Sequence, residues 1–133
     1  MIVDSSVIIA ILKHEPDWRS LSNALDSAES SHISAANYLE ASIVVDAWRK
    51  PILSREFDEL IERFKIAIEP VTAEQARIAR QAYRDYGRGG GHPANLNFGD
   101  CFSYALARAK REPILYKGDD FGHTDLRGAI PQE

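Results

Sequence analysis

Apolar positions fall into short β-branched runs separated by longer stretches with helical spacing. The short runs predict strands at 1–3, 30–34, 66–69 and 113–116, and a short edge strand near 129–130. Helical spacing and cap signals predict helices over 7–13, 17–28, 35–49, 53–64, 72–86 and 97–111. Short strands that alternate with helices indicate βαβ crossovers. The sequence therefore predicts an α/β fold: a central, mostly parallel sheet of four to five strands with helices on both faces.

An apolar stripe marks the helix predicted over 35–49. Leu39, Ile43 and Ala47 recur every four residues. Glu40 precedes Ile43 by three positions, so it lies beside this stripe. A buried carboxylate needs a partner, so Glu40 is not expected to be an ordinary solvated residue.

Length and composition limit the class of protein. The chain has 133 residues, 44% hydrophobic and 27% charged, which predicts one globular domain over 1–133. The longest apolar run is Val7–Leu12, too short to cross a bilayer, so no membrane association is expected. The single cysteine, Cys101, forms no internal disulfide and favours a cytoplasmic location.

The net charge of −4 argues against a general nucleic-acid binder. This average depends on a few acids that follow predicted strands or begin predicted helices. Without them the chain holds 15 acids against 16 bases and is about neutral. They are Asp4, Glu40, Asp100, Asp119 and Asp120.

These acids are expected to meet at one edge of the sheet. Asp4 directly follows the first predicted strand, and Asp119 and Asp120 follow the last. Asp100 lies in the first turn of a predicted helix and Glu40 in the second turn of another. Ligands of an open parallel sheet bind beyond the carboxyl ends of its strands. Four segments far apart in sequence are therefore expected to bring carboxylates together.

A cluster of carboxylates requires protonation or a cation. Two unit charges about 4 Å apart repel by about 4 kcal/mol at an effective dielectric constant of 20. Oxygen-only ligands suit Mg²⁺ or Mn²⁺ better than zinc. Such ions activate water and neutralise the transition state of phosphodiester cleavage.

Each acid also has a purely structural interpretation. Asp4 is in place to cap a helix, and Asp100 is in place to form a capping box with Asn97. Asp119 and Asp120 suit a turn. None of these local roles predicts that the segments meet, so the joint pattern favours a functional cluster.

Four segments resemble the motifs of PIN-domain ribonucleases, and more narrowly the VapC toxins of bacterial toxin–antitoxin pairs. They are residues 2–7, 38–41, 97–105 and 115–121, in the order of that family. The resemblance covers nearly the whole chain. It implies a three-layer α/β/α PIN-like fold and a Mg²⁺- or Mn²⁺-dependent endoribonuclease that cleaves tRNA or rRNA.

The resemblance also implies roles for the acids. Asp4 and Asp100 would be metal ligands, and Glu40 would bind the metal or orient its water. Asp119 would be the fourth catalytic and metal-binding acid, with Asp120 as the alternative.

Partners follow from the same resemblance. It implies a VapB-type antitoxin that wraps the toxin and inserts a basic side chain into the acidic pocket. It also implies a toxin homodimer.

Ser6 matches the Ser/Thr of the family and would hydrogen-bond the acidic cluster.

Two other functions remain open. One is a catalytically inert PIN-like module that binds RNA or protein. The other is a phosphatase or phosphoacceptor domain, which commonly carries a second Asp two residues after the first, where this chain has Ser6.

A basic stripe is predicted on the helix over 72–86 and just beyond it. Its members are Arg77, Arg80, Arg84 and Arg88, at spacings of three, four and four. The stripe would contact RNA phosphates or an antitoxin, or else form a solvated face. A charge run alone favours the solvated face.

Overall fold

A computed structural model describes residues 1–130; residues 131–133 lie outside the described part. The strands are β1 (Ile2–Val3), β2 (Ser31–Ser34), β3 (Ile66–Glu69) and β4 (Ile114–Leu115). The helices are α1 (Ser5–Leu12), α2 (Trp18–Ser27), α3 (Ala35–Ala47), α4 (Pro51–Arg63), α5 (Ala73–Tyr86) and α6 (Phe98–Lys110), with a 3₁₀ helix at Asp120–His123. Within residues 1–130 no helix combines the length and apolarity needed to cross a bilayer.

All four strands are parallel, in the order β3-β2-β1-β4. The predicted α/β fold with a central parallel sheet is confirmed. The edge strand predicted near 129–130 is reduced to a single bridge between Ile114 and Gly128. Its hydrogen bonds run from Ala129 N to Ile114 O at 2.7 Å and from Ile114 N to Arg127 O at 3.0 Å.

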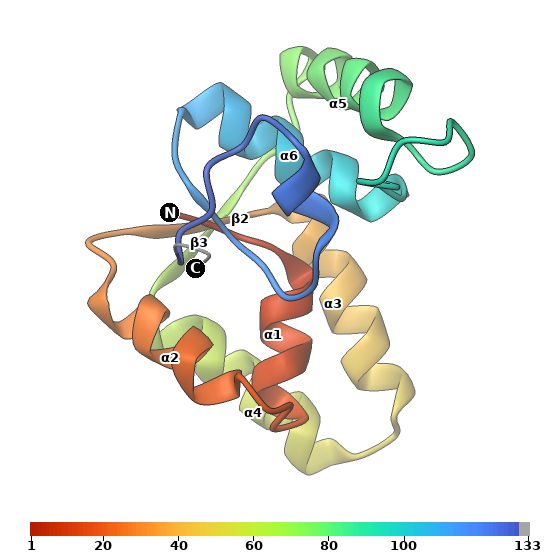
Figure 1. Ribbon diagram of the computed structural model, residues 1–133. Coiled ribbons are helices and arrows are strands. Elements are labelled where there is room, and N and C mark those ends of the chain that lie inside the picture. Colours follow the sequence, from red (N-terminus) through yellow and green to blue (C-terminus); the bar gives the residue numbers. More distant parts are fainter. Residues whose placement is uncertain (131–133) are drawn as a thin grey trace.

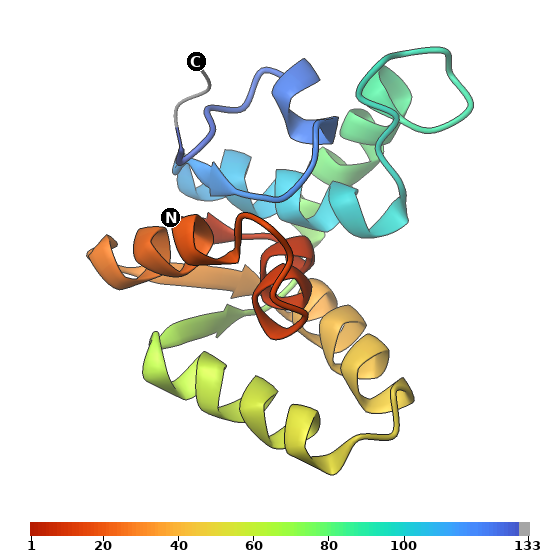
Figure 2. The same ribbon diagram turned by 60° about the horizontal axis from the view of Figure 1, so that its bottom comes forward.

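Helices cover both faces of the sheet (Figures 1 and 2). Val3, Ile33 and Leu115 point into a core formed with α1, α2, α3 and α4. Ile2 and Ile114 point to the other face, into a core formed with α5 and α6. Alternate strand residues thus serve opposite layers, which gives the three-layer arrangement expected from the sequence.

The buried face of α3 differs from the face that the apolar spacing indicates. Leu39 and Ile43 are each 58% exposed. Asn37, Ala41 and Val45 are buried instead. The expectation that apolar neighbours shield Glu40 from solvent is therefore wrong, because that apolar stripe is itself exposed.

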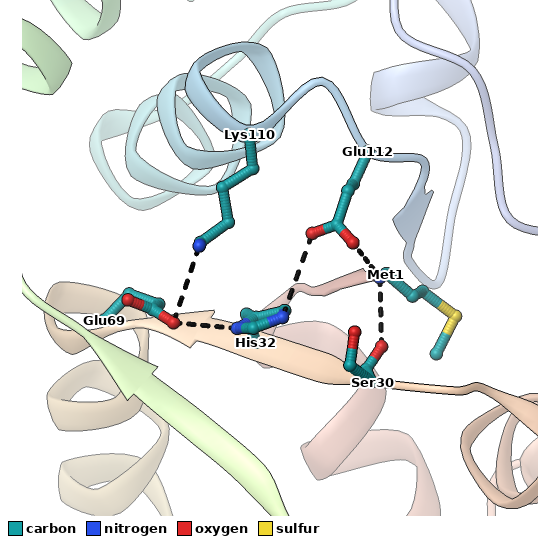
Figure 3. Close-up of polar contacts among 6 residues, drawn as sticks. All are labelled: Met1, Ser30, His32, Glu69, Lys110 and Glu112. Atoms are coloured by element: carbon teal, nitrogen blue, oxygen red, sulfur yellow. Dashed lines mark hydrogen bonds and ion pairs between the residues drawn. The ribbon is translucent and has the colours of Figure 1, made fainter.

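One corner of the sheet is closed by paired charges (Figure 3). His32 Nδ1 lies 2.7 Å from Glu69 Oε1, and Lys110 Nζ lies 3.7 Å from the same oxygen. Glu112 Oε1 accepts from the Met1 ammonium at 3.1 Å. Glu69 and Glu112 each contact basic groups from other segments, and these contacts tie the end of α6 to the strands.

Candidate active site

A cavity of about 440 Å³ lies beyond the carboxyl ends of β1 and β4. Five carboxylates line it: Asp4, Glu40, Asp100 and Asp120, which the sequence predicted as a cluster, and Glu15, which it did not. The chain therefore brings together residues up to 116 positions apart, because parallel strands end at the same edge.

Asp4 is the most buried of these acids, with 3% of its surface exposed. Its Oδ2 accepts from Ser6 N at 3.0 Å and so caps α1. Its Oδ1 accepts from Ser103 Oγ on α6 at 2.5 Å. Each carboxylate oxygen has its own donor, so the orientation of Asp4 is fixed from two elements.

Ser103 and Asn37 form a buried support behind Asp4. Ser103 Oγ lies 3.0 Å from Asn37 Oδ1, and Asn37 Nδ2 donates to the carbonyl of Gly99 at 2.9 Å. The two side chains are 0% and 1% exposed. Sequence reasoning missed them, because their partners lie at least 62 positions away along the chain.

Asp100 combines a local and a site role. Its backbone N–H donates to Asn97 Oδ1 at 2.9 Å, and its Oδ2 accepts from Asn97 N at 3.0 Å. This is the capping box expected from the sequence. Burial raises the pKa of Asp100 from 3.8 to about 7, opposed by the bond from Asn97 and reinforced by the negative charges of Asp4, Asp120 and Glu40.

Glu40 reaches the cavity from the second turn of α3. Its Oε1 accepts from Ser5 Oγ at 2.6 Å. Its carboxylate lies against the backbone of Gly99, where an added Cβ would come within 2.8 Å of Glu40 Cδ. Gly99 therefore allows the Glu40 carboxylate to lie close to the start of α6 at this point.

Asp120 and Asp119 differ in placement. Asp120 lines the cavity and contributes to the raised pKa of Asp100. Asp119 precedes the 3₁₀ helix as its N-cap residue and does not line the cavity. Its negative charge contributes instead to the raised pKa of Tyr116, whose main cause is burial.

Ser6 contacts the cluster through its backbone rather than its hydroxyl. Ser6 Oγ accepts from Lys117 N at 3.0 Å and so joins the ends of β1 and β4. The hydroxyl contact with the acids is supplied by Ser5 and Ser103. Lys117 also lines the cavity, but its Nζ pairs with Asp17 at 2.6 Å.

The donor set fits a hard divalent cation. Among residues 1–130 no three acid, imidazole or thiolate groups already surround a common metal position. Mg²⁺ suits such a site, because it retains several waters and takes only one or two protein carboxylates. The raised pKa of Asp100 shows that burial and neighbouring charges disfavour its anion, a cost that a cation would offset.

Comparison with known proteins agrees with this geometry. The PIN domain family matches residues 1–126. Ribonuclease VapC28 of Mycobacterium tuberculosis is 58% identical over 130 residues, which cover 98% of each chain. The fold is similar to VapC20 of Mycobacterium tuberculosis, described as a Sarcin-Ricin loop cleaving toxin (16% identity, TM-score 0.74, 98% of each chain).

A toxin–antitoxin complex from Klebsiella pneumoniae also shares the fold (15% identity, TM-score 0.68, 90% of this chain and 88% of that one). At these identities the structures support the fold, whereas the sequence match supports the family. The resemblance stated from the motifs is confirmed: the chain belongs to the PIN domain family and, within it, to the VapC ribonucleases.

Proposed function

We propose that this protein is a toxin that cleaves cellular RNA by Mg²⁺- or Mn²⁺-dependent hydrolysis. The observation that carries the proposal is a cavity lined by five carboxylates, in which the pKa of Asp100 is raised to about 7. Membership of the VapC ribonucleases supports RNA as the substrate. The metal, when bound, lowers the pKa of its water and stabilises charge on the phosphate.

The acids of the cavity have different roles in this proposal. Asp4 and Asp100 hold the metal, since both are anchored by backbone donors that fix their carboxylates. Glu40, held by Ser5, binds the metal directly or orients its water. Asp120 is the fourth acid that the cavity favours, in place of Asp119.

The test is cleavage of total bacterial RNA by purified, antitoxin-free protein in Mg²⁺, Mn²⁺ or EDTA. Discrete fragments are expected with metal only, and none with Asp100→Asn. Asp58→Asn, an exposed acid on α4, is the matched control and keeps full activity. Full cleavage by folded Asp100→Asn contradicts the assignment.

We also propose that a VapB-type antitoxin neutralises the protein, and that the toxin is a cytoplasmic homodimer. A toxin–antitoxin complex shares this fold. Val44 lines the acidic cavity, and Leu39 and Ile43 are exposed apolar side chains on the same helix, so α3 provides apolar surface for a partner. Co-expression with the antitoxin should restore growth, and Ile43→Asp should weaken the complex in a pull-down while leaving cleavage intact.

A further inference from the structure

A second concave surface adjoins the acidic cavity. It is a groove of about 630 Å³ between α5 and the start of α6. Its lining includes three aromatic residues and two arginines: Tyr83, Phe98, Phe102, Arg80 and Arg88. Its size is within the range of small-ligand sites, and its lining is almost entirely apolar.

Phe98 is the most exposed large apolar side chain on the described surface, at 80%. Its ring meets Phe102 edge-on, with centroids 4.9 Å apart, so one face of Phe98 is open. Phe98 occupies the first turn of α6, two residues before Asp100. An uncovered aromatic face at this position is suited to stacking by a ligand that also reaches the carboxylates.

The opposite wall of the groove is preformed. Tyr83 donates its hydroxyl proton to the carbonyl of Arg88 at 3.0 Å. Its ring also lies against the backbone of Gly87, where an added Cβ would come within 2.6 Å of Tyr83 Cδ2. Glycine at 87 therefore permits a fixed aromatic wall, and binding costs little ordering of this side chain.

The charges of the groove favour an anion. Arg80 and Arg88 are exposed, and within the described residues neither guanidinium forms an ion pair. Within residues 1–130 the lining of the groove contains no acid, so a second copy that seats the same groove on it would bring no carboxylate to these guanidinium groups. A polyanion can bind both guanidinium groups.

The groove and the acidic cavity are neighbours, because Asn97 lines each of them. An RNA strand with a phosphate at the carboxylates can therefore extend toward the groove. Bases stack on aromatic side chains while arginines bind the backbone, a combination common in single-strand recognition.

We propose that the groove between α5 and α6 binds an unpaired nucleobase of the RNA, adjacent to the phosphate that is cleaved. Phe98 is the stacking platform, and Arg80 and Arg88 bind the flanking phosphates. The proposal rests on the proposed ribonuclease function and deepens it. It predicts that cleavage sites lie next to unpaired nucleotides.

The test measures binding without cleavage. Fluorescence anisotropy in EDTA compares a labelled single-stranded adenine octamer with the same backbone lacking bases. Phe98→Ala should weaken binding of the adenine octamer about 10-fold and leave the abasic one unchanged. Phe98→Trp should retain binding, and Ile52→Ala, at an apolar site on α4 that is 67% exposed, should have no effect.

The arginines have a separate readout. Arg88→Gln should reduce the slope of log affinity against log salt by about 1, for both octamers. Arg77→Gln, on α5 and outside the groove lining, is the control for loss of one arginine and should leave the slope nearly unchanged.

The outcomes separate this proposal from the nuclease assignment. Equal affinity of wild type and Phe98→Ala for the adenine octamer overturns the proposed nucleobase site in the groove, even if metal-dependent cleavage is seen. Loss of base-dependent binding in Phe98→Ala supports it, even if no cleavage is found. If sedimentation shows that Phe98→Ala converts a dimer to a monomer, the groove is an interface between copies and the proposal fails.

Discussion

Ser103 Oγ on α6 donates a hydrogen bond to Asp4 Oδ1 at 2.5 Å, across 99 positions of the chain. The same carboxylate caps α1 through its other oxygen. One acid therefore joins the start of the first helix to the middle of the last. Its geometry depends on the packing of α6 against β1, so the site is assembled only when the sheet is complete.

Ser103→Ala should weaken both stability and metal binding. It removes the donor to a buried carboxylate and also leaves Asn37 Oδ1 without its contact. The free energy of unfolding should fall by about 1–3 kcal/mol. The Mg²⁺ concentration for half-maximal cleavage should rise about 10-fold, because supporting residues orient metal ligands.

Urea unfolding and a Mg²⁺ titration of cleavage check this. Ser42→Ala is a matched control, since Ser42 Oγ donates only to the carbonyl of Tyr38 on its own helix. An unchanged Mg²⁺ requirement in Ser103→Ala would show that Ser103 is structural alone.

Gly99→Ala should separate activity from folding. The added methyl meets the Glu40 carboxylate, the end of a flexible chain, which can move aside at small cost. The melting temperature should therefore change little, while cleavage falls about 10-fold or more because Glu40 leaves its place. Gly90→Ala, in the loop where an added Cβ has its nearest neighbour at 3.4 Å, is the control for the methyl group.

The stability of the metal-free protein should fall as pH rises from 4 to 7. Asp100 has a pKa of about 7 in the folded protein and about 4 when unfolded. Between these values the folded state holds a proton that the unfolded state has lost, so raising the pH favours unfolding. Above pH 7 this contribution is constant.

Asp100→Asn lacks that titration. In EDTA at pH 8 it should be more stable than wild type by about 2 kcal/mol, and at pH 4 the two should be similar. Mg²⁺ should stabilise wild type more at pH 8 than at pH 5, because protons compete with the metal. Parallel pH–stability curves for the two proteins would contradict the raised pKa.

The fourth acid can be identified by comparing two neighbours. Asp120→Asn should reduce cleavage by at least 10-fold, since Asp120 lines the cavity with Asp100. Asp119→Asn should leave cleavage within about 2-fold, because Asp119 lies outside that lining. The reverse ranking in a single-turnover assay would restore the assignment of Asp119 made from the motif.

The parallel sheet and the meeting of its acids could be predicted because local signals agreed with them. Asp4 and Asp100 have the cap roles that their sequence neighbours indicate. The same residues also face the cavity. The capping role and the role at the cavity therefore do not exclude each other. Helices begin where strands end at this edge, so one residue can have both roles.

The burial of α3 could not be predicted from its own sequence. Asn37 is buried in place of Leu39 because its Nδ2 donates to the carbonyl of Gly99 on α6 and its Oδ1 lies against Ser103 Oγ. Those contacts depend on how α3 packs against α6. The sequence periodicity of one helix does not give this information. Aliphatic residues are left in solvent where a partner surface is proposed.

The paired charges of Figure 3 and the crowded carboxylates lie around the same sheet. Substitutions in these two clusters have different consequences. Where acids and bases are paired, losing Glu112 or Lys110 destabilises the fold and leaves the proposed reaction unchanged. Where acids crowd, replacing Asp100 relieves repulsion and abolishes the proposed reaction. Selection for a more stable but harmless protein would therefore favour Asp100→Asn, which removes the charge and keeps an oxygen that can accept from Asn97 N.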